Sequence, residues 1–190
     1  MLPVVVADAG PLIHLAQINK LHLVQRLFGQ VTITPSVKHE AVDEGVRLGY
    51  ADAKVIGSAL RDGWVVVESV PSRLAKSAEK LALGENVSMA DAETLLLAKE
   101  KRAELLVDEK IVSDLAKMYR LRVWGTWTLL LESLSRGLVE VADIEDAIEE
   151  LGRRRHKLKE KQALEILDAA KRMASTRKEQ KTKPKKRAKK

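Results

Sequence analysis

Cysteine is absent from the 190-residue sequence, and aromatic residues make up only 3% of it. Without cysteine the chain cannot form disulfides, thiolate metal sites or a cysteine nucleophile, which agrees with a cytoplasmic location. With so few aromatics, the core has to consist mainly of Leu, Val, Ile and Ala. No apolar run approaches the length of a membrane span, and the N-terminal segment does not have the pattern of a signal peptide. We therefore expect an aliphatic core and no membrane segment.

The charge is unevenly distributed along the chain. Residues 152–190 contain 17 Lys/Arg and 4 Asp/Glu, a net charge of +13, whereas residues 1–151 carry a net charge of −6. A strongly basic segment favours a polyanionic partner such as RNA. The basic residues that we expect to contact nucleic acid are Arg153, Arg154, Arg155, Lys183, Lys185, Lys186 and Arg187. The alternative is that the Lys-rich terminus only promotes solubility and the arginine run is a solvated helix face.

Short, β-branched segments alternate with segments of helical periodicity through most of the sequence. The predicted strands are 2–7, 31–33, 64–67, 105–107 and 122–124. One predicted helix has Pro11 in its first turn and runs to 18, one enters at 34–36 and continues over 37–44, and one opens at the Ser88-x-x-Asp91 capping pattern and runs to about 102. The other predicted helices are 21–28, 51–60, 72–83, 110–119 and 127–135. This alternation favours an α/β fold: a three-layer α/β/α sandwich around a central parallel sheet, with a helical, basic C-terminal extension.

The composition changes after residue 141. We predict a first domain over residues 1–141, a helical extension over 142–173 and a disordered Lys-rich tail over 174–190. The extension keeps a thin apolar stripe at helical spacing. The tail has almost no apolar residue, so it cannot bury enough surface to fold alone.

Two predicted strands end in aspartate, Asp8 and Asp108. Ligands of open α/β sheets bind beyond the carboxyl ends of the strands, so these carboxylates can lie side by side. Grouped carboxylates repel one another unless a cation offsets their charge, and Mg²⁺ and Mn²⁺ prefer such oxygen ligands. Glu40 and Asp91, each on a helix, could join the same edge. Each acid also has a simpler explanation: Asp8, Asp91 and Asp108 as turn or helix-cap residues, Glu40 as a solvated one.

The segment Asp8-Ala9-Gly10-Pro11-Leu12-Ile13-His14-Leu15 resembles the opening D-[AT]-[SG]-P-L-I-x-L of PIN-domain proteins, especially a subgroup with a domain of unknown function related to VapC-type toxins. Further segments of this kind follow in the same order up to about residue 140: 31–37 before Glu40, 84–85 before 91–98, 105–109, 123–126, 129–131 and 136–139. Their order and spacing together make the resemblance specific.

The resemblance implies a PIN-like sandwich and a metal-dependent endoribonuclease. Its catalytic acids would be Asp8, Glu40, Asp91 and Asp108, and its Mg²⁺ or Mn²⁺ ligands Asp8, Asp91 and Asp108. Glu93 competes with Asp91 for one position, but the two lie about 200° apart around a helix and should not face the site equally. Gly10 stands where many relatives have Ser or Thr, so its backbone amide would replace a hydroxyl. Thr126 could support the metal edge or cap the following helix.

The resemblance also implies partners: RNA as substrate, an antitoxin protein as inhibitor, and a second copy of the chain in a homodimer. The alternative is a catalytically weak or inactive PIN-fold protein that binds RNA or a ribonucleoprotein. Histidines 14, 22, 39 and 156 form no metal-ligand pattern, and His39 should point away from Glu40. Trp124 and Trp127 are interpreted as core or dimer-contact residues, with base stacking as the alternative.

Overall fold

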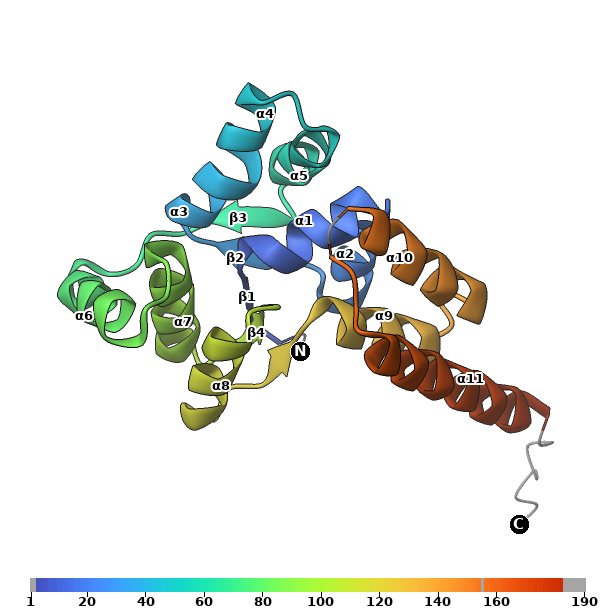
Figure 1. Cartoon of the computed structure of the whole chain (residues 1–190). Helices are drawn as coiled ribbons and strands as arrows, with labels where there is room; N and C mark the ends of the chain where they lie inside the picture. The colour runs from blue at the N-terminus through green and yellow to red at the C-terminus, as the bar shows by residue number, and fades with distance from the viewer. Residues whose placement is uncertain (1–2, 155, 183–190) are drawn as a thin grey trace, which may run out of the picture. The chain divides into compact units, whose positions relative to one another are not determined.

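The computed structural model describes residues 3–154 and 156–182 of the chain (Figure 1). These residues belong to two compact units, Met1–Thr126 and Trp127–Lys190, called here the first and second units. The domain boundaries predicted at residues 141 and 173 stay predictions. None of the described helices is both long and apolar enough to cross a bilayer.

The first unit is built on a five-stranded, entirely parallel sheet. Its strands are β1 (Val5–Ala7), β2 (Val31–Ile33), β3 (Val65–Val67), β4 (Glu104–Leu106) and β5 (Val123–Trp124), in the spatial order β3-β2-β1-β4-β5. Residues of β1 are paired with β4 from Val5–Glu104 to Ala7–Leu106. The predicted α/β fold with a parallel sheet is confirmed. The order places β1 and β4, which precede Asp8 and Asp108, next to each other at the centre.

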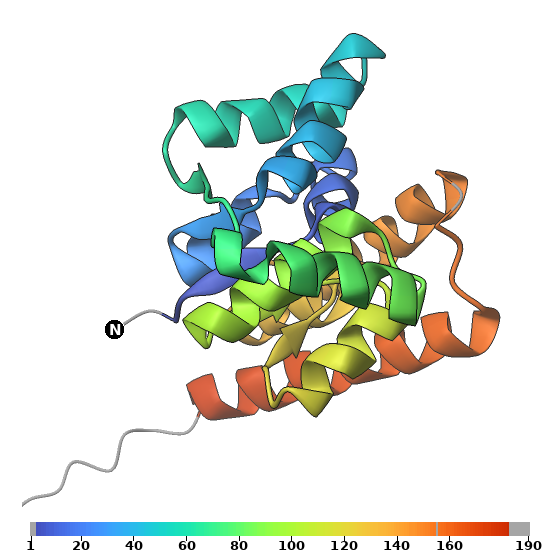
Figure 2. The same ribbon diagram turned by 90° about the vertical axis from the view of Figure 1, so that its left-hand side faces the viewer.

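Helices flank this sheet, as the alternating pattern predicts. Their bounds are α1 (Ala9–Gln17), α2 (His22–Phe28), α3 (Pro35–Lys38), η1 (His39–Glu44), α4 (Gly45–Arg47), α5 (Ala51–Arg61), η2 (Ser72–Leu74), α6 (Ala75–Glu85), α7 (Met89–Lys101) and α8 (Lys110–Met118). Helix α7 packs on β1 and β4, and α5 packs on β3 and α1. Figure 2 shows α6 and α7, the two green helices, side by side. These connections hold the strand ends in fixed positions.

The core is aliphatic, as the composition requires. Val5, Val6 and Ala7 of β1 are all buried, which is the pattern of a parallel strand covered on both faces. Leu95 and Leu97 of α7 pack with strand residues in one continuous cluster. Trp124 is buried against Phe28, with the ring centroids 5.7 Å apart in an edge-to-face arrangement. The interpretation of Trp124 as a core residue is therefore confirmed.

Two helices begin where the sequence predicts, and one of them contains a turn that the sequence does not predict. Helix α1 begins at Ala9 with Asp8 as its N-cap residue, so Pro11 lies in the first turn, as predicted. The helix predicted to enter at 34–36 begins at Pro35 with Thr34 as its N-cap, and it passes into a π-helical turn, η1. Such turns are rare in proteins, and those that occur are often at functional sites. No sequence pattern predicts them. Glu40 lies within this turn.

The second unit carries the helices after the sheet: most of α9 (Thr126–Ser135), then α10 (Val141–Arg153) and α11 (Glu160–Thr182). Arg177 of α11 donates from Nη1 to the carbonyl of Leu134 at 2.8 Å and from Nη2 to Glu140 at 2.5 Å. Its side chain is only 16% exposed. These bonds fix α11 against the end of α9. Helix α11 runs to Thr182, past residue 174, from which the sequence favours a disordered tail.

Candidate active site

Asp8 and Asp108 meet at the carboxyl edge of the sheet. The backbone amide of Asp8 donates to the carbonyl of Leu106 at 2.9 Å, which continues the β1–β4 pairing to the site. A Cβ placed on Gly10 would lie 3.8 Å from Oδ2 of Asp8 and 3.7 Å from Oδ2 of Asp108. Gly10 therefore lies between the two carboxylates, and its amide donates to Asp8 at 3.5 Å. The strand-end geometry brings these two acids together.

Asp91 reaches the site from the first turn of α7. Its carboxylate oxygen Oδ2 accepts from the amide of Ser88 at 3.0 Å and from the Ser88 hydroxyl at 2.6 Å, while the Asp91 amide donates to Ser88 Oγ. This capping box is the S-x-x-D pattern of the sequence. Asp91 is 6% exposed, and its charge acts on both Asp8 and Glu40. Glu93, the competing acid, accepts instead from the Ser36 hydroxyl at 2.6 Å.

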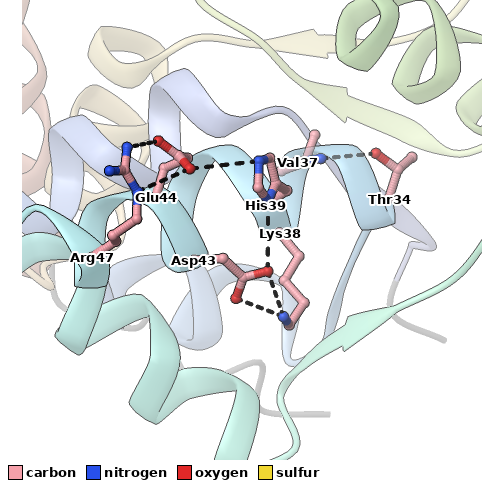
Figure 3. Close-up of polar contacts among 7 residues, drawn as sticks. All are labelled: Thr34, Val37, Lys38, His39, Asp43, Glu44 and Arg47. Carbon is pink, nitrogen blue, oxygen red and sulfur yellow. Dashed lines mark hydrogen bonds and ion pairs between the residues drawn. The ribbon is translucent and has the colours of Figure 1, made fainter.

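Glu40 stands at the exposed side of the site, on η1. Burial and the negative charge of Asp91 raise the pKa of its carboxyl. Its charged neighbours are engaged elsewhere, as Figure 3 shows: Lys38 bonds Asp43 at 2.7 Å, and His39 lies 3.8 Å from Glu44. His39 thus belongs to a surface ion-pair group. Among the described residues, Glu40 forms no ion pair and has no cation beside it.

The charge of Asp8 is poorly compensated. Burial raises the pKa of Asp8 to about 7; Asp91 adds to this rise and Glu40 adds less, while the amides of Ala9 and Gly10 oppose it. A carboxyl with such a pKa is half protonated near neutral pH. Acids with shifted pKa values are frequent at functional sites, because such sites bring buried groups of like charge close together. Asp8, Glu40 and Asp91 therefore form an acidic group without a counter-charge of its own.

Asp108 is in a different electrostatic state. Burial alone would raise its pKa, but hydrogen bonds from His14 and Thr126 lower the pKa below the ordinary value. Nδ1 of His14 lies 2.7 Å from Oδ2, and Thr126 donates from its amide to Oδ1 at 2.7 Å and from its hydroxyl to Oδ2 at 2.6 Å. His14 was not expected here, because 94 residues separate it from Asp108.

Gly125 allows this arrangement. A Cβ on Gly125 would stand 3.1 Å from Oδ1 of Asp108, tighter than nearly all Cβ contacts in proteins. The glycine therefore lets the 125–126 peptide approach the carboxylate so that the Thr126 amide can donate to it. Thr126 is buried and fixes Asp108 with two bonds.

The chemistry of these donors fits a divalent cation. Carboxylate oxygens suit Mg²⁺ and Mn²⁺, and hydrogen bonds such as those on Asp91 and Asp108 commonly orient metal ligands. The raised pKa of Asp8 marks the place where positive charge is lacking. In the described part of the chain, however, no three acidic or histidine side chains already stand in an arrangement that holds a metal ion.

The predicted basic contacts lie apart from this acidic site in the sequence. Arg153 pairs with Glu149 and Glu150, and Arg154 lies 3.7 Å from Glu150, so both join ion pairs along their own helix. The remaining predicted nucleic-acid contacts, Arg155, Lys183, Lys185, Lys186 and Arg187, lie outside the described residues. Their role stays a prediction.

Comparisons with known proteins identify the family of this chain. The chain is similar to PAE2754 from Pyrobaculum aerophilum, a solved structure, at 17% identity and a TM-score of 0.49, over 70% of this chain and 97% of that one. No curated protein matches significantly. A family model described as a PIN domain, DUF3368, matches residues 4–172, further than the motifs up to residue 140 indicate. The chain therefore belongs to the DUF3368 family of PIN domains, whose relatives are typically nucleases that use divalent metals.

Proposed function

We propose that this protein is a metal-dependent endoribonuclease that hydrolyses phosphodiester bonds of single-stranded RNA at the acidic group. The observation that carries the proposal is the gathering of Asp8 with Asp108, Asp91 and Glu40 at the carboxyl edge of the sheet. Burial and, to a lesser extent, the charges of Asp91 and Glu40 raise the pKa of Asp8 to about 7. Asp8, Asp91 and Asp108 would hold Mg²⁺ or Mn²⁺. When bound, this cation supplies activation of water and stabilisation of charge on the phosphate.

The residues of the chain itself have separate roles in this proposal. Asp8 and Asp91 come from a strand end and a capped helix, so both carboxylates are held on rigid elements. Asp108 is oriented by His14 and Thr126. Glu40 stands at the exposed side, where it can accept a proton from an attacking water. No nucleophilic side chain is required.

The direct test is cleavage of a labelled single-stranded RNA by the full chain with Mn²⁺, with Mg²⁺ and with EDTA. We expect cleavage with either metal and none with EDTA, because four carboxylates without a cation repel the phosphodiester. Single-stranded DNA of the same sequence tests the choice of RNA. Absence of cleavage under every condition would contradict the proposal, and equal cleavage in EDTA would contradict the metal role.

The alternative is a PIN-fold protein that binds RNA and cleaves it weakly or not at all. It is favoured by the acids not being gathered in a ready metal arrangement within the described residues.

We further propose, from family resemblance, a toxin role opposed by an antitoxin that places a cationic segment in the acidic site. Growth arrest on expression, relieved by a neighbouring small gene product, would support that role.

His14 gives a test of how Asp108 is held. His14→Ala removes the bond to Oδ2, and we expect cleavage to fall by about tenfold to 100-fold, the usual effect of losing a group that orients a ligand. His14→Asn can still place a donor near the position of Nδ1 and should recover much of the activity, whereas His14→Gln should not. Equal rates for the three variants would show that His14 does not act through Asp108.

A further inference from the structure

A second charged region lies at the opposite edge of the sheet from the acids. A hollow of about 530 Å³ opens where α7 leads into β4 and α8 leads into β5. These are the amino ends of the strands, whereas Asp8 and Asp108 follow their carboxyl ends. From Glu104 to Asp108 the chain advances about 13 Å, at roughly 3.3 Å per strand residue. The hollow is therefore separate from the acidic group.

The exposed side chains of this hollow are all cationic. They are Lys99, Arg102, Arg120 and Arg122. The one carboxylate in the lining, Glu104, accepts from the Trp124 indole at 2.6 Å and lies 3.5 Å from Arg122. The hollow thus has a net charge of +3 within a segment, residues 1–151, whose overall charge is −6. Such a local excess of cations is the electrostatic footprint of a polyanion site.

Two of these arginines occupy backbone positions that side chains disfavour. Arg102 and Arg120 have φ angles of +50° and +60°. All other described residues with positive φ are Gly or Asn: Asn19, Gly29, Gly49, Gly63, Asn86 and Gly137. Glycine is the usual residue where a helix ends in this conformation, because a Cβ there is strained. Both exceptions are arginine, and both line the same hollow.

The four cations differ in their side-chain contacts: two lie over aromatic rings and two do not. Nζ of Lys99 lies 4.0 Å from the centre of the Tyr119 ring, and the guanidinium of Arg122 lies 4.5 Å from that of Trp124. Arg102 and Arg120 make no hydrogen bond or ion pair through their side chains with any described residue. Their donors are therefore available, and guanidinium groups match phosphate oxygens in pairs of bonds.

We propose that this hollow binds phosphates of single-stranded RNA at a site separate from cleavage, with Arg102 and Arg120 as the principal contacts. The proposal rests on the proposed function, since it supposes that the substrate is RNA. An acidic protein segment is the competing ligand, but protein interfaces depend on buried apolar or aromatic anchors. The exposed lining here consists of cations only, which suits sequence-independent contact with a phosphate backbone.

The test is binding of a fluorescent single-stranded RNA of about twenty nucleotides, longer than typical single-strand binding sites. Binding to the full chain is measured in EDTA, so that RNA is not cleaved. The variant is Arg102→Gly with Arg120→Gly, which removes two charges and relieves the backbone at both positions. The control is Arg26→Ala with Arg61→Ala, two exposed arginines on α2 and α5 that do not line the hollow. Thermal unfolding checks that both variants fold.

We expect the glycine variant to bind RNA about tenfold more weakly than the wild type and the control variant to bind nearly as well. The slope of log affinity against log salt should fall by about 1.4, because each lost single-strand contact contributes about 0.7. Equal binding by both variants would overturn the proposal. It would also be overturned if the glycine variant lost affinity for a polyglutamate peptide but not for RNA. Absence of cleavage in the metal assay, with this binding loss intact, would overturn the nuclease function alone.

Discussion

Asp8→Asn is expected to reduce metal-dependent RNA cleavage by at least about 100-fold, which corresponds to about 2.7 kcal/mol of activation free energy. Asparagine keeps the size of the side chain and an oxygen that can accept from the Gly10 amide. It removes the negative charge that a divalent cation requires beside Asp91. The loss should appear in single-turnover cleavage at saturating Mn²⁺, so that weaker RNA binding does not contribute.

The matched control for this substitution is Asp62→Asn, an exposed aspartate at the end of α5. It removes the same charge far along the chain from the acidic group and should leave cleavage within about twofold of the wild type. Cleavage by Asp8→Asn at the wild-type rate would show that the acidic group is not the site of hydrolysis.

The same substitution should make the metal-free protein more stable at alkaline pH. The pKa of Asp8 rises from 3.8 to about 7 on folding. A carboxyl with a raised folded pKa contributes stability that is present below the unfolded pKa and is lost as pH rises through the folded pKa. Stability of the wild type in EDTA should therefore fall between about pH 4 and pH 7. The full shift corresponds to at most about 4 kcal/mol.

Asp8 is only half-buried by exposed area, so solvent lowers this figure, and we expect a gain of about 1–3 kcal/mol for Asp8→Asn at pH 8. At pH 4 the gain should vanish, because Asp8 is then neutral in the folded wild type. Urea unfolding in EDTA at both pH values measures the difference. Destabilisation by Asp8→Asn at pH 8 would contradict this prediction, because asparagine can still cap α1.

Addition of Mn²⁺ to the same samples links the two predictions. A cation at a concentration of about 100 times its Kd stabilises the folded state by about 2.7 kcal/mol. We expect this gain for the wild type and for Asp62→Asn but not for Asp8→Asn. Asp8→Asn would then be inactive and folded in EDTA, and Mn²⁺ would not stabilise it. This combination would show that the substitution abolishes metal binding and cleavage without unfolding the protein.

The sequence predicts those parts of the structure that depend on local pattern. Alternating strands and helices are sufficient for the parallel sheet, and aspartates that end two adjacent strands necessarily lie near each other. The S-x-x-D pattern correctly predicts the capping box that holds Asp91, which explains why Glu93, two residues on, bonds Ser36 instead. These features are set within a few residues of chain.

The features that sequence reasoning missed depend on contacts between distant segments. His14 bonds Asp108 across 94 residues, and no spacing rule relates the two. The π-helical turn around Glu40 has no compositional signature. Helix α11 continues to Thr182, and Arg177 in this part of it bonds Leu134 and Glu140, a contact that composition does not predict. The left-handed backbone conformation of Arg102 and Arg120 cannot be predicted from the sequence and is known only from their φ angles.

The shortness of the strands has a kinetic consequence. The acidic group and the cationic hollow lie at opposite ends of the strands. Because β4 has only three residues, the distance between them is short. Opposite charges at the two ends of the strands contribute a local electric dipole along them. A polyanion diffusing nearby would be repelled by one edge and drawn to the other, so productive collisions should begin at the amino edge. The association rate for RNA should then fall steeply with ionic strength, before any effect on hydrolysis itself.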